Sequence, residues 1–250
     1  MGRPDTGSGR RRAVPSSLQR RRSAGVRPRP LPDHFGSPSP ETTSRSGQAL
    51  LFSLRRASAI GAKGVVMHAG SAALGNDPDA AMRQLRERLL AVLDEVNAPP
   101  LLIEPTAGGG GALAAGADSL EAYLSALGRD ERVGVCLDTC HMHAAGHDLS
   151  TRASFALALR AYARAAGAAR IGLVHVNDSR DPVGSKRDRH AAIGSGTIGA
   201  DAFGALFTCA AVVGVPLVVE SDESSHRADI EALAALRTIG PSKGARANAR

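Results

Sequence analysis

The stretch Arg132–Asp148, RVGVCLDTCHMHAAGHD, decides the fold of this chain. Its apolar run from Val133 to Leu137 lies between charged residues and a loop rich in His, Gly and Ala, which is typical of a buried strand that delivers side chains into a site. Asp138 and His141 stand where this strand ends. A carboxylate and an imidazole three residues apart are suitable ligands for a borderline divalent ion such as zinc. Taken alone, the pair also fits a capping Asp and a surface His.

Four further strand-like runs end in, or carry, a residue of the same ligand types. Helical patterns separate successive runs, and this order predicts right-handed β-α-β units with a parallel sheet. In such folds the functional groups lie at the carboxyl ends of the strands, where every candidate of this chain is found. The four runs and their candidates are GVVMHAG with His68, PLLIE with Glu104, IGLVHVND with His175 and PLVVE with Glu220.

The helical patterns between these strands are amphipathic. Asp77 is a plausible N-cap with Pro78 at the first helical position. The predicted helices cover approximately residues 50–60, 77–97, 120–127, 151–166, 200–213 and 225–239.

The long polar loop after IGLVHVND supplies a second pair of candidates. In SKRDRH, Asp188 and His190 alternate with Arg187 and Arg189. In an extended backbone the two ligand types point to one side and the guanidinium groups to the other. We therefore predict a metal ion on one side and phosphate-facing arginines on the other, which suits a phosphodiester substrate. An ordinary charged surface loop would have the same composition.

The positive charge is concentrated at the start of the chain. Residues 1–48 contain ten Arg and three acids, which gives +7, whereas residues 49–250 contain 21 basic and 21 acidic residues, which gives zero. The first segment also holds seven of the fourteen prolines. We predict a disordered basic segment over 1–47, a metal-binding barrel domain over 48–239 and a disordered tail over 240–250. An Arg-rich tail can bind nucleic acid through phosphates.

The cysteines and the apolar runs predict a cytoplasmic protein. Cys136, Cys140 and Cys209 are odd in number and lack C-x-x-C spacing, so we expect reduced, mostly buried thiols. The basic N-terminus has no apolar region behind it, and no apolar run reaches membrane-spanning length, so neither a secretory signal nor a membrane span is expected. We expect a monomer.

Five motifs together resemble the endonuclease IV family of abasic-site DNA repair enzymes. They follow one another in order between about Gln48 and Ile239, and the third and fourth are highly specific. The motifs are GVVMHAGS, LLIEPTAG, VGVCLDTCHMHAAGHD, LVHVNDSRDPVGSKRDRHAAIGSGTIG and PLVVES. The resemblance implies a TIM-barrel fold, three zinc ions at the carboxyl face of the strands, and cleavage of double-stranded DNA on the 5′ side of abasic sites.

Carried over by position, the resemblance implies three zinc sites that share one carboxylate. The ligands would be His68 and Glu104 for the first ion; Glu104, Asp138, His175 and Glu220 for the second; and His141, Asp188 and His190 for the third. We expect Glu104 and Glu220 to be the catalytic carboxylates. A zinc-activated hydroxide would attack the phosphorus in line while the ions neutralise the other oxygens. The abasic nucleotide would leave the helical stack, a movement that costs little without a base to unpair.

Two departures from the family pattern concern the N-terminal part. A TIM barrel has eight strand–helix units, and the strands predicted here match the last five. The family takes a further His ligand of the first zinc from the preceding strand, which falls in the Arg/Pro-rich segment, so we expect the first zinc site to be incomplete. An open barrel leaves two sheet edges unpaired, and we expect low stability and weak or no incision.

Two other function classes fit the same pattern. Sugar isomerases and epimerases related to xylose isomerase share the barrel and its acid/His metal site, but they do not need the Asp188–His190 pair. A truncated, inactive homologue that still binds metal and DNA would be favoured by the missing strands.

Overall fold

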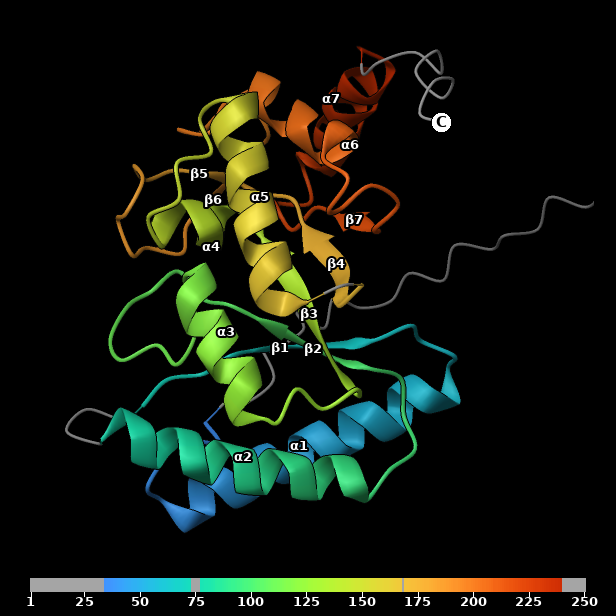
Figure 1. The fold of residues 1–250 in the computed structure, drawn as a ribbon. Helices are drawn as coiled ribbons and strands as arrows, with labels where there is room; N and C mark the ends of the chain where they lie inside the picture. Colours follow the sequence, from blue (N-terminus) through green and yellow to red (C-terminus); the bar gives the residue numbers. More distant parts are fainter. Residues whose placement is uncertain (1–33, 73–76, 168, 240–250) are drawn as a thin grey trace, which may run out of the picture.

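Five parallel strands form the central sheet of the molecule (Figure 1), in the order β1-β2-β3-β4-β7. The computed structural model describes residues 34–72, 77–167 and 169–239, so the predicted tails over 1–33 and 240–250 lie outside the described residues. All four neighbouring pairs are parallel. The strands are β1 (Val65–His68), β2 (Leu101–Glu104), β3 (Val133–Asp138), β4 (Ile171–His175) and β7 (Leu217–Val218). The predicted parallel α/β fold with five strands is confirmed.

The main helices pack on the outer face of this sheet. In Figure 1, α3 and α5 lie side by side in front of the strands, α1 and α2 lie below them, and α6 and α7 lie above. Alternate strand residues face opposite sides of a sheet, and the outward-facing Leu101, Ile103, Val135 and Leu137 are completely buried. The five main helices are α1 (Pro40–Ala59), α2 (Pro78–Asp94), α3 (Ala117–Ala126), α5 (Arg152–Ala166) and α7 (His226–Ile239).

Leu102 fills the inner face of the sheet, and three glycines surround its side chain. A Cβ added at Gly134 would lie 2.7 Å from Leu102 Cδ2, and one added at Gly172 would lie 2.9 Å from the same atom. A Cβ at Gly64 would lie 3.1 Å from Leu102 Cδ1. One large side chain therefore occupies the space that side chains of three neighbouring segments would need.

The folded region begins earlier than we predicted. Helix α1 starts at Pro40, so the prediction that residues up to 47 are disordered is wrong for this part of the segment. Ser39 caps the helix by accepting a hydrogen bond from the amide of Thr42, and Pro40 suits the first helical position. The hydroxyls of the buried Thr43 and Ser46 bond to carbonyls one turn back. Their hydrogen bonds are satisfied within the helix, so this polar face is buried although its composition indicates a disordered tail.

Several short elements differ from the prediction. The expected loop after β3 begins with helix α4 (Thr139–Ala144), and the polar loop contains an antiparallel pair, β5 (Asp178–Ser179) with β6 (His190–Ala191). The helix expected over 200–213 is a 3₁₀ turn, η1 (Ala200–Gly204), followed by α6 (Ala205–Thr208). It ends there because Cys209 adopts an extended conformation.

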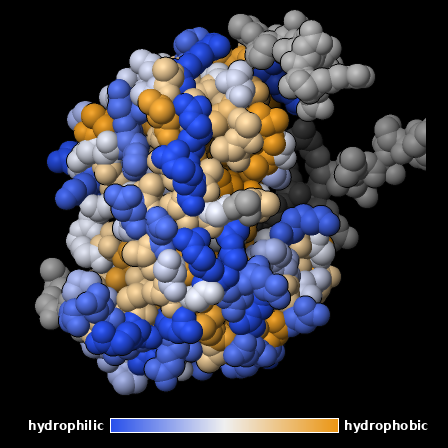
Figure 2. Space-filling view, in the orientation of Figure 1, coloured by the Kyte–Doolittle hydropathy of each residue, from blue (hydrophilic) through white to orange (hydrophobic). Residues whose placement is uncertain are grey.

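The surface is mostly hydrophilic over α1 and α2, in the lower part of Figure 2, and more hydrophobic over α6 and β7, at the upper right. Val213 and Val218 are exposed large apolar residues near these two elements. All three cysteines are free and buried, as predicted. Among the helices of the described residues, none is long and apolar enough to cross a membrane.

Candidate metal centre

The carboxyl ends of the strands bring together the candidates that the sequence places there. His68, Glu104, Asp138 and His175 are each the last residue of their strand, and Glu220 follows β7 by two residues. The parallel register sets His68 beside Glu104 and Asp138 beside His175. The edge of the sheet thus positions four donor side chains directly, and the residues that follow β7 supply the fifth.

Two further elements complete the centre. Helix α4 begins directly after Asp138, whose Oδ1 accepts a hydrogen bond from the amide of His141 at 2.8 Å. The β5–β6 pair returns the polar loop to the sheet, which brings Asp188 and His190 into reach. We refer to the resulting set of eight residues as the donor cluster: His68, Glu104, Asp138, His141, His175, Asp188, His190 and Glu220.

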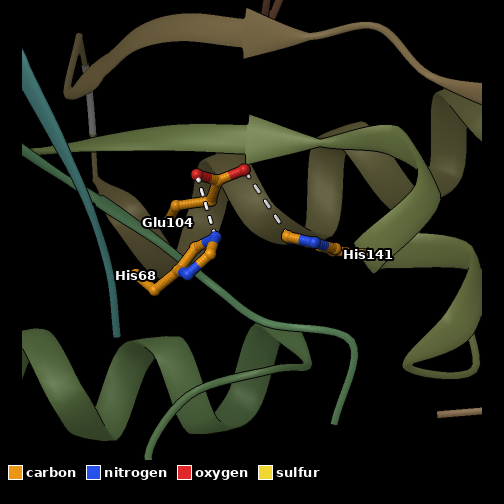
Figure 3. Close-up of side chains that lie close together, drawn as sticks. All are labelled: His68, Glu104 and His141. Atoms are coloured by element: carbon orange, nitrogen blue, oxygen red, sulfur yellow. Dashed lines mark ion pairs between the residues drawn. The ribbon is translucent and has the colours of Figure 1, made fainter. Parts of the chain in front are cut away.

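The first group in the cluster consists of His68, Glu104 and His141 (Figure 3). The two oxygens of Glu104 face different histidines: Oε2 lies 3.7 Å from His68 Nε2 and Oε1 lies 3.6 Å from His141 Nδ1. The three donor atoms lie within 4.8 Å of one another. His141 Nδ1 also lies 3.0 Å from the Pro105 carbonyl, to which it can only donate, so His141 does not replace the His ligand that the first site lacks.

The second group consists of Glu104, Asp138, His175 and Glu220. His175 Nδ1 lies 2.9 Å from Glu104 Oε1 and 3.0 Å from Glu220 Oε2. Glu104 belongs to both groups, as the resemblance implied for a bridging carboxylate.

The third group consists of His141, Asp188 and His190. The two Asp188 oxygens lie 3.2 Å from His141 Nε2 and 3.1 Å from His190 Nε2. His190 Nε2 is buried and makes no hydrogen bond of acceptable geometry despite this short distance. A buried imidazole nitrogen that faces carboxylates without a hydrogen bond is placed as a metal ligand would be.

The carboxylates give the cluster a strong preference for positive charge. Burial lowers the pKa of His141, but Asp138, Asp188 and Glu104 outweigh it and raise that pKa to about 10. Asp188 has a pKa well below its usual range, because the imidazoles of His141 and His190 lie against its carboxylate.

His175 and His190 respond in the same way. Burial lowers the pKa of His175, but contacts with Cys136, Glu104 and Glu220 raise it overall. For His190 too, burial is the largest single effect and lowers the pKa, but Asp188 and Asp138 together raise that pKa overall. The imidazoles therefore hold protons in positions where divalent ions would supply the same charge.

The donor set fits zinc. Imidazole nitrogens and carboxylate oxygens are its usual protein ligands, together with thiolates. Two cysteines that we predicted only as buried thiols also lie among the donors, Cys136 with Glu104 and His175, and Cys140 with Asp138 and His190. Burial raises the pKa of Cys136 to about 11 and that of Cys140 to about 12, so both are neutral thiols beside the oxygen and nitrogen donors.

Asn177 is a residue of the site that the sequence analysis missed. Its side chain is completely buried and its Nδ2 donates to Asp138 Oδ2 at 2.6 Å and to Glu220 Oε2 at 3.3 Å. Its Oδ1 accepts a hydrogen bond from the Glu220 amide at 3.0 Å. The Thr139 hydroxyl bonds to both the backbone N–H and the carbonyl of Asn177. Asn177 thus holds together two carboxylates from different strands.

The predicted arrangement of the two arginines is only partly correct. Asp188 and His190 do face the cluster, but Arg187 and Arg189 both pair with the carboxylate of Asp181 instead of presenting free charge. The nearly buried position of Asp181 beside them explains this pairing.

Two other histidines of the stretch Arg132–Asp148 lie outside the donor groups. His143 is buried and contacts Leu149 and Thr197. The ring of His147 packs edge-on against Tyr162 at 5.0 Å.

Comparison with known proteins agrees with this geometry. The family model of xylose isomerase-like TIM barrels matches residues 23–239. The probable endonuclease 4 of Streptomyces avermitilis is 45% identical over 209 residues, which cover 82% of this chain and 67% of the relative. This chain belongs to the endonuclease IV family. As a member of the endonuclease IV family it is a nuclease with the TIM-barrel type of fold.

Two further members of the endonuclease IV family support the assignment. The probable endonuclease 4 of Streptomyces coelicolor is 44% identical, and the match covers 82% of this chain and 71% of that protein. The crystal structure of endonuclease IV from Thermus thermophilus superposes with a TM-score of 0.70 at 28% identity, covering 83% of this chain and 74% of that one.

Proposed function

We propose that this chain is a zinc-dependent endonuclease that cleaves double-stranded DNA on the 5′ side of abasic sites. The observation that carries the proposal is the continuity of the donor cluster. Glu104 is shared by the first and second groups, and the third group adjoins them through His141, whose Nδ1 faces Glu104 and whose Nε2 faces Asp188. Shared ligands would hold the ions close enough to act on one phosphodiester. Membership of the endonuclease IV family supports the same reaction.

Each group would hold one ion. Glu104 and Glu220 would be the catalytic carboxylates, because both contact His175 and lie where the second ion would meet the substrate. When bound, the zinc ions would activate water and neutralise the charge that develops on the phosphate oxygens. The chain itself supplies the fixed positions: His141 is held by a hydrogen-bonding contact between Nδ1 and the Pro105 carbonyl at 3.0 Å, and Glu220 by Asn177.

The third group favours a nuclease over a sugar isomerase or epimerase. Asp188 and His190 come from a loop and contact His141 on α4, so they add a third site to the two that the strand ends make. We propose in addition that incision by this chain is slow, because β1 and β7 each have only one partner strand within the described residues.

A labelled duplex with one tetrahydrofuran abasic analogue tests the proposal. The analogue cannot undergo β-elimination, so a cut detected on a denaturing gel must come from hydrolysis. We expect the zinc-loaded protein to give a product that ends on the 5′ side of the analogue, and a duplex without the analogue to remain intact. Glu104→Gln removes the shared carboxylate and should lower the rate at least about 100-fold.

Several results would contradict the proposal. One is the absence of incision when zinc-loaded protein is present in an amount equal to the duplex. The others are a cut on the 3′ side of the analogue and equal rates for Glu104→Gln and the unmodified chain. Incision at a rate matching the Thermus thermophilus enzyme would contradict only the expectation of slow turnover.

A further inference from the structure

We infer that a cavity beside the donor cluster binds a phosphate group of the DNA backbone next to the one that is cleaved. This inference rests on the proposed function and adds a subsite to it. The cavity, referred to below as the Arg180 cavity, has a volume of about 420 Å³, within the range of about 300–1,000 Å³ that small-molecule sites occupy. His190 and Glu220 line it, so a group bound there lies against the donor cluster.

Arg180 is the basic side chain best placed to bind an anion in this cavity. It follows β5, and its backbone N–H donates to the Arg189 carbonyl at 3.0 Å. Its Nε donates to the His190 carbonyl at 2.8 Å, which fixes the guanidinium at the cavity wall. Among the described residues, its two terminal nitrogens have no hydrogen bond or ion pair. A guanidinium held in this way presents two donors that match two phosphate oxygens.

The neighbouring arginines are directed elsewhere. Arg187 and Arg189 both contact the single carboxylate of Asp181, and neither lines the cavity. Arg180 lies in the same loop with its charge available, and Ser195 and Ser224 supply hydroxyl groups to the same cavity. A guanidinium fork with hydroxyl donors beside it matches a phosphate diester, whose charge is spread over two oxygens, and the carboxylates of Glu220 and Asp222 oppose an anion in the same cavity.

An acidic residue in the same cavity allows the charge of the bound group to be tested. Asp222 also lines the cavity and is exposed. If an anion binds, Arg180 attracts it and Asp222 repels it; if a cation binds, the two effects are reversed. Substitution of either residue by its neutral counterpart therefore reports the charge of the occupant.

Binding of an abasic duplex with a non-hydrolysable scissile linkage is measured by fluorescence anisotropy over a range of salt concentrations. We expect Arg180→Gln in the zinc-loaded protein to bind about tenfold more weakly, with a salt slope smaller by about one. Arg180→Lys should keep the slope but lose part of the affinity, because Lys lacks the Nε donor. Asp222→Asn should bind more tightly. Arg160→Gln, an exposed arginine on α5, is the matched control and should behave as the unmodified chain.

The outcomes separate this inference from the proposed function. If the unmodified chain incises and binds abasic DNA while Arg180→Gln has the same affinity and slope, the inference is overturned and the proposed function stands. Tighter binding by Arg180→Gln with weaker binding by Asp222→Asn would also overturn it. If the unmodified chain neither incises nor binds DNA, calorimetric titration with inorganic phosphate decides: Arg180-dependent binding supports the anion site, and its absence overturns it. Zinc content and the thermal midpoint confirm that each variant is folded.

Discussion

At the scale of single residues, Asn177 links two carboxylates of the donor cluster, and its removal should weaken metal binding. In Asn177→Ala, Asp138 and Glu220 lose their shared donor and are free to turn away from the site. Loss of such a supporting hydrogen bond typically costs about 10- to 100-fold in metal affinity. We expect that decrease for zinc, measured by competition with a chromophoric chelator.

Two variants make the test specific. Asn177→Asp keeps the shape of the side chain but replaces the donor by an acceptor, so zinc affinity should fall as well. Asn97→Ala, at an exposed position far along the chain, should leave it unchanged. An Asn177→Ala protein that binds zinc as tightly as the unmodified chain would show that the amide has no role in holding the ligands.

All eight residues of the donor cluster were singled out in the sequence as possible zinc ligands. Five lie at or just after the ends of parallel strands at one edge of the sheet, His141 follows Asp138 by three residues, and Asp188 and His190 alternate with arginines in a loop. Asn177 was not, since an amide is neither charged nor a common zinc ligand, and its role depends on Asp138 and Glu220 from distant segments. The pairing of Arg187 and Arg189 with Asp181 was missed for a similar reason. Alternation along the backbone predicts on which side a guanidinium lies but not which acid it meets.

At the scale of elements, the carboxylate of Asp178 anchors the loop that follows β6. It accepts hydrogen bonds from the amides of Gly194 at 3.0 Å, Gly196 at 3.1 Å and Ile198 at 2.9 Å. A Cβ at Gly196 would collide with the Asp178 carboxylate and with the Ser179 carbonyl. Gly196→Ala should therefore lower the free energy of unfolding by about 3 kcal/mol, measured by urea denaturation.

A second glycine provides the control for this prediction. Gly47 lies within α1, and a Cβ there would make only an ordinary contact of 3.5 Å with Val92 Cγ2. Gly47→Ala should raise the free energy of unfolding by about 0.5–1 kcal/mol through its better helix propensity. If both substitutions change stability equally, the close contact at Gly196 is relieved by movement of the loop.

Long elements followed from the sequence and short ones did not. Helix α2 begins as predicted, with Asp77 as its N-cap and Pro78 in its first turn. Helix α4 was missed because the residues after Asp138 were interpreted as a loop, although a capping role for this Asp was considered; Asp138 caps the helix through the His141 amide. A strand that ends in Asp and continues into a possible first turn is the signal that could have revealed it.

At the scale of the whole molecule, protonation of the donor cluster links stability to pH. In the unfolded chain His141 titrates near 6.5, and in the folded chain its pKa is about 10. A raised pKa contributes stability that is complete below pH 6.5 and is lost as the pH rises toward 10. His175 and His190 shift in the same direction. The metal-free protein should therefore become less stable between pH 6.5 and about pH 9.

Zinc should remove this dependence, because bound ions replace the protons on the imidazoles. We expect the thermal midpoint of chelator-treated protein to fall by at least about 2–4 °C over this range, which corresponds to about 1 kcal/mol. The midpoint of zinc-loaded protein should stay higher at both ends. A metal-free protein that gains stability as the pH rises would contradict the expected protonation.

Leu102 fills the space beside three glycines, and this packing has a consequence for how the fold changes in evolution. A side chain added at Gly134 or Gly172 would force Leu102 to move, and one added at Gly64 would displace it by a few tenths of an ångström. A smaller residue at 102 would release that volume to one of the glycine positions. The residues at these four positions should therefore covary in size among homologous barrels, and an alanine tolerated in one lineage should be harmful when transferred into this background.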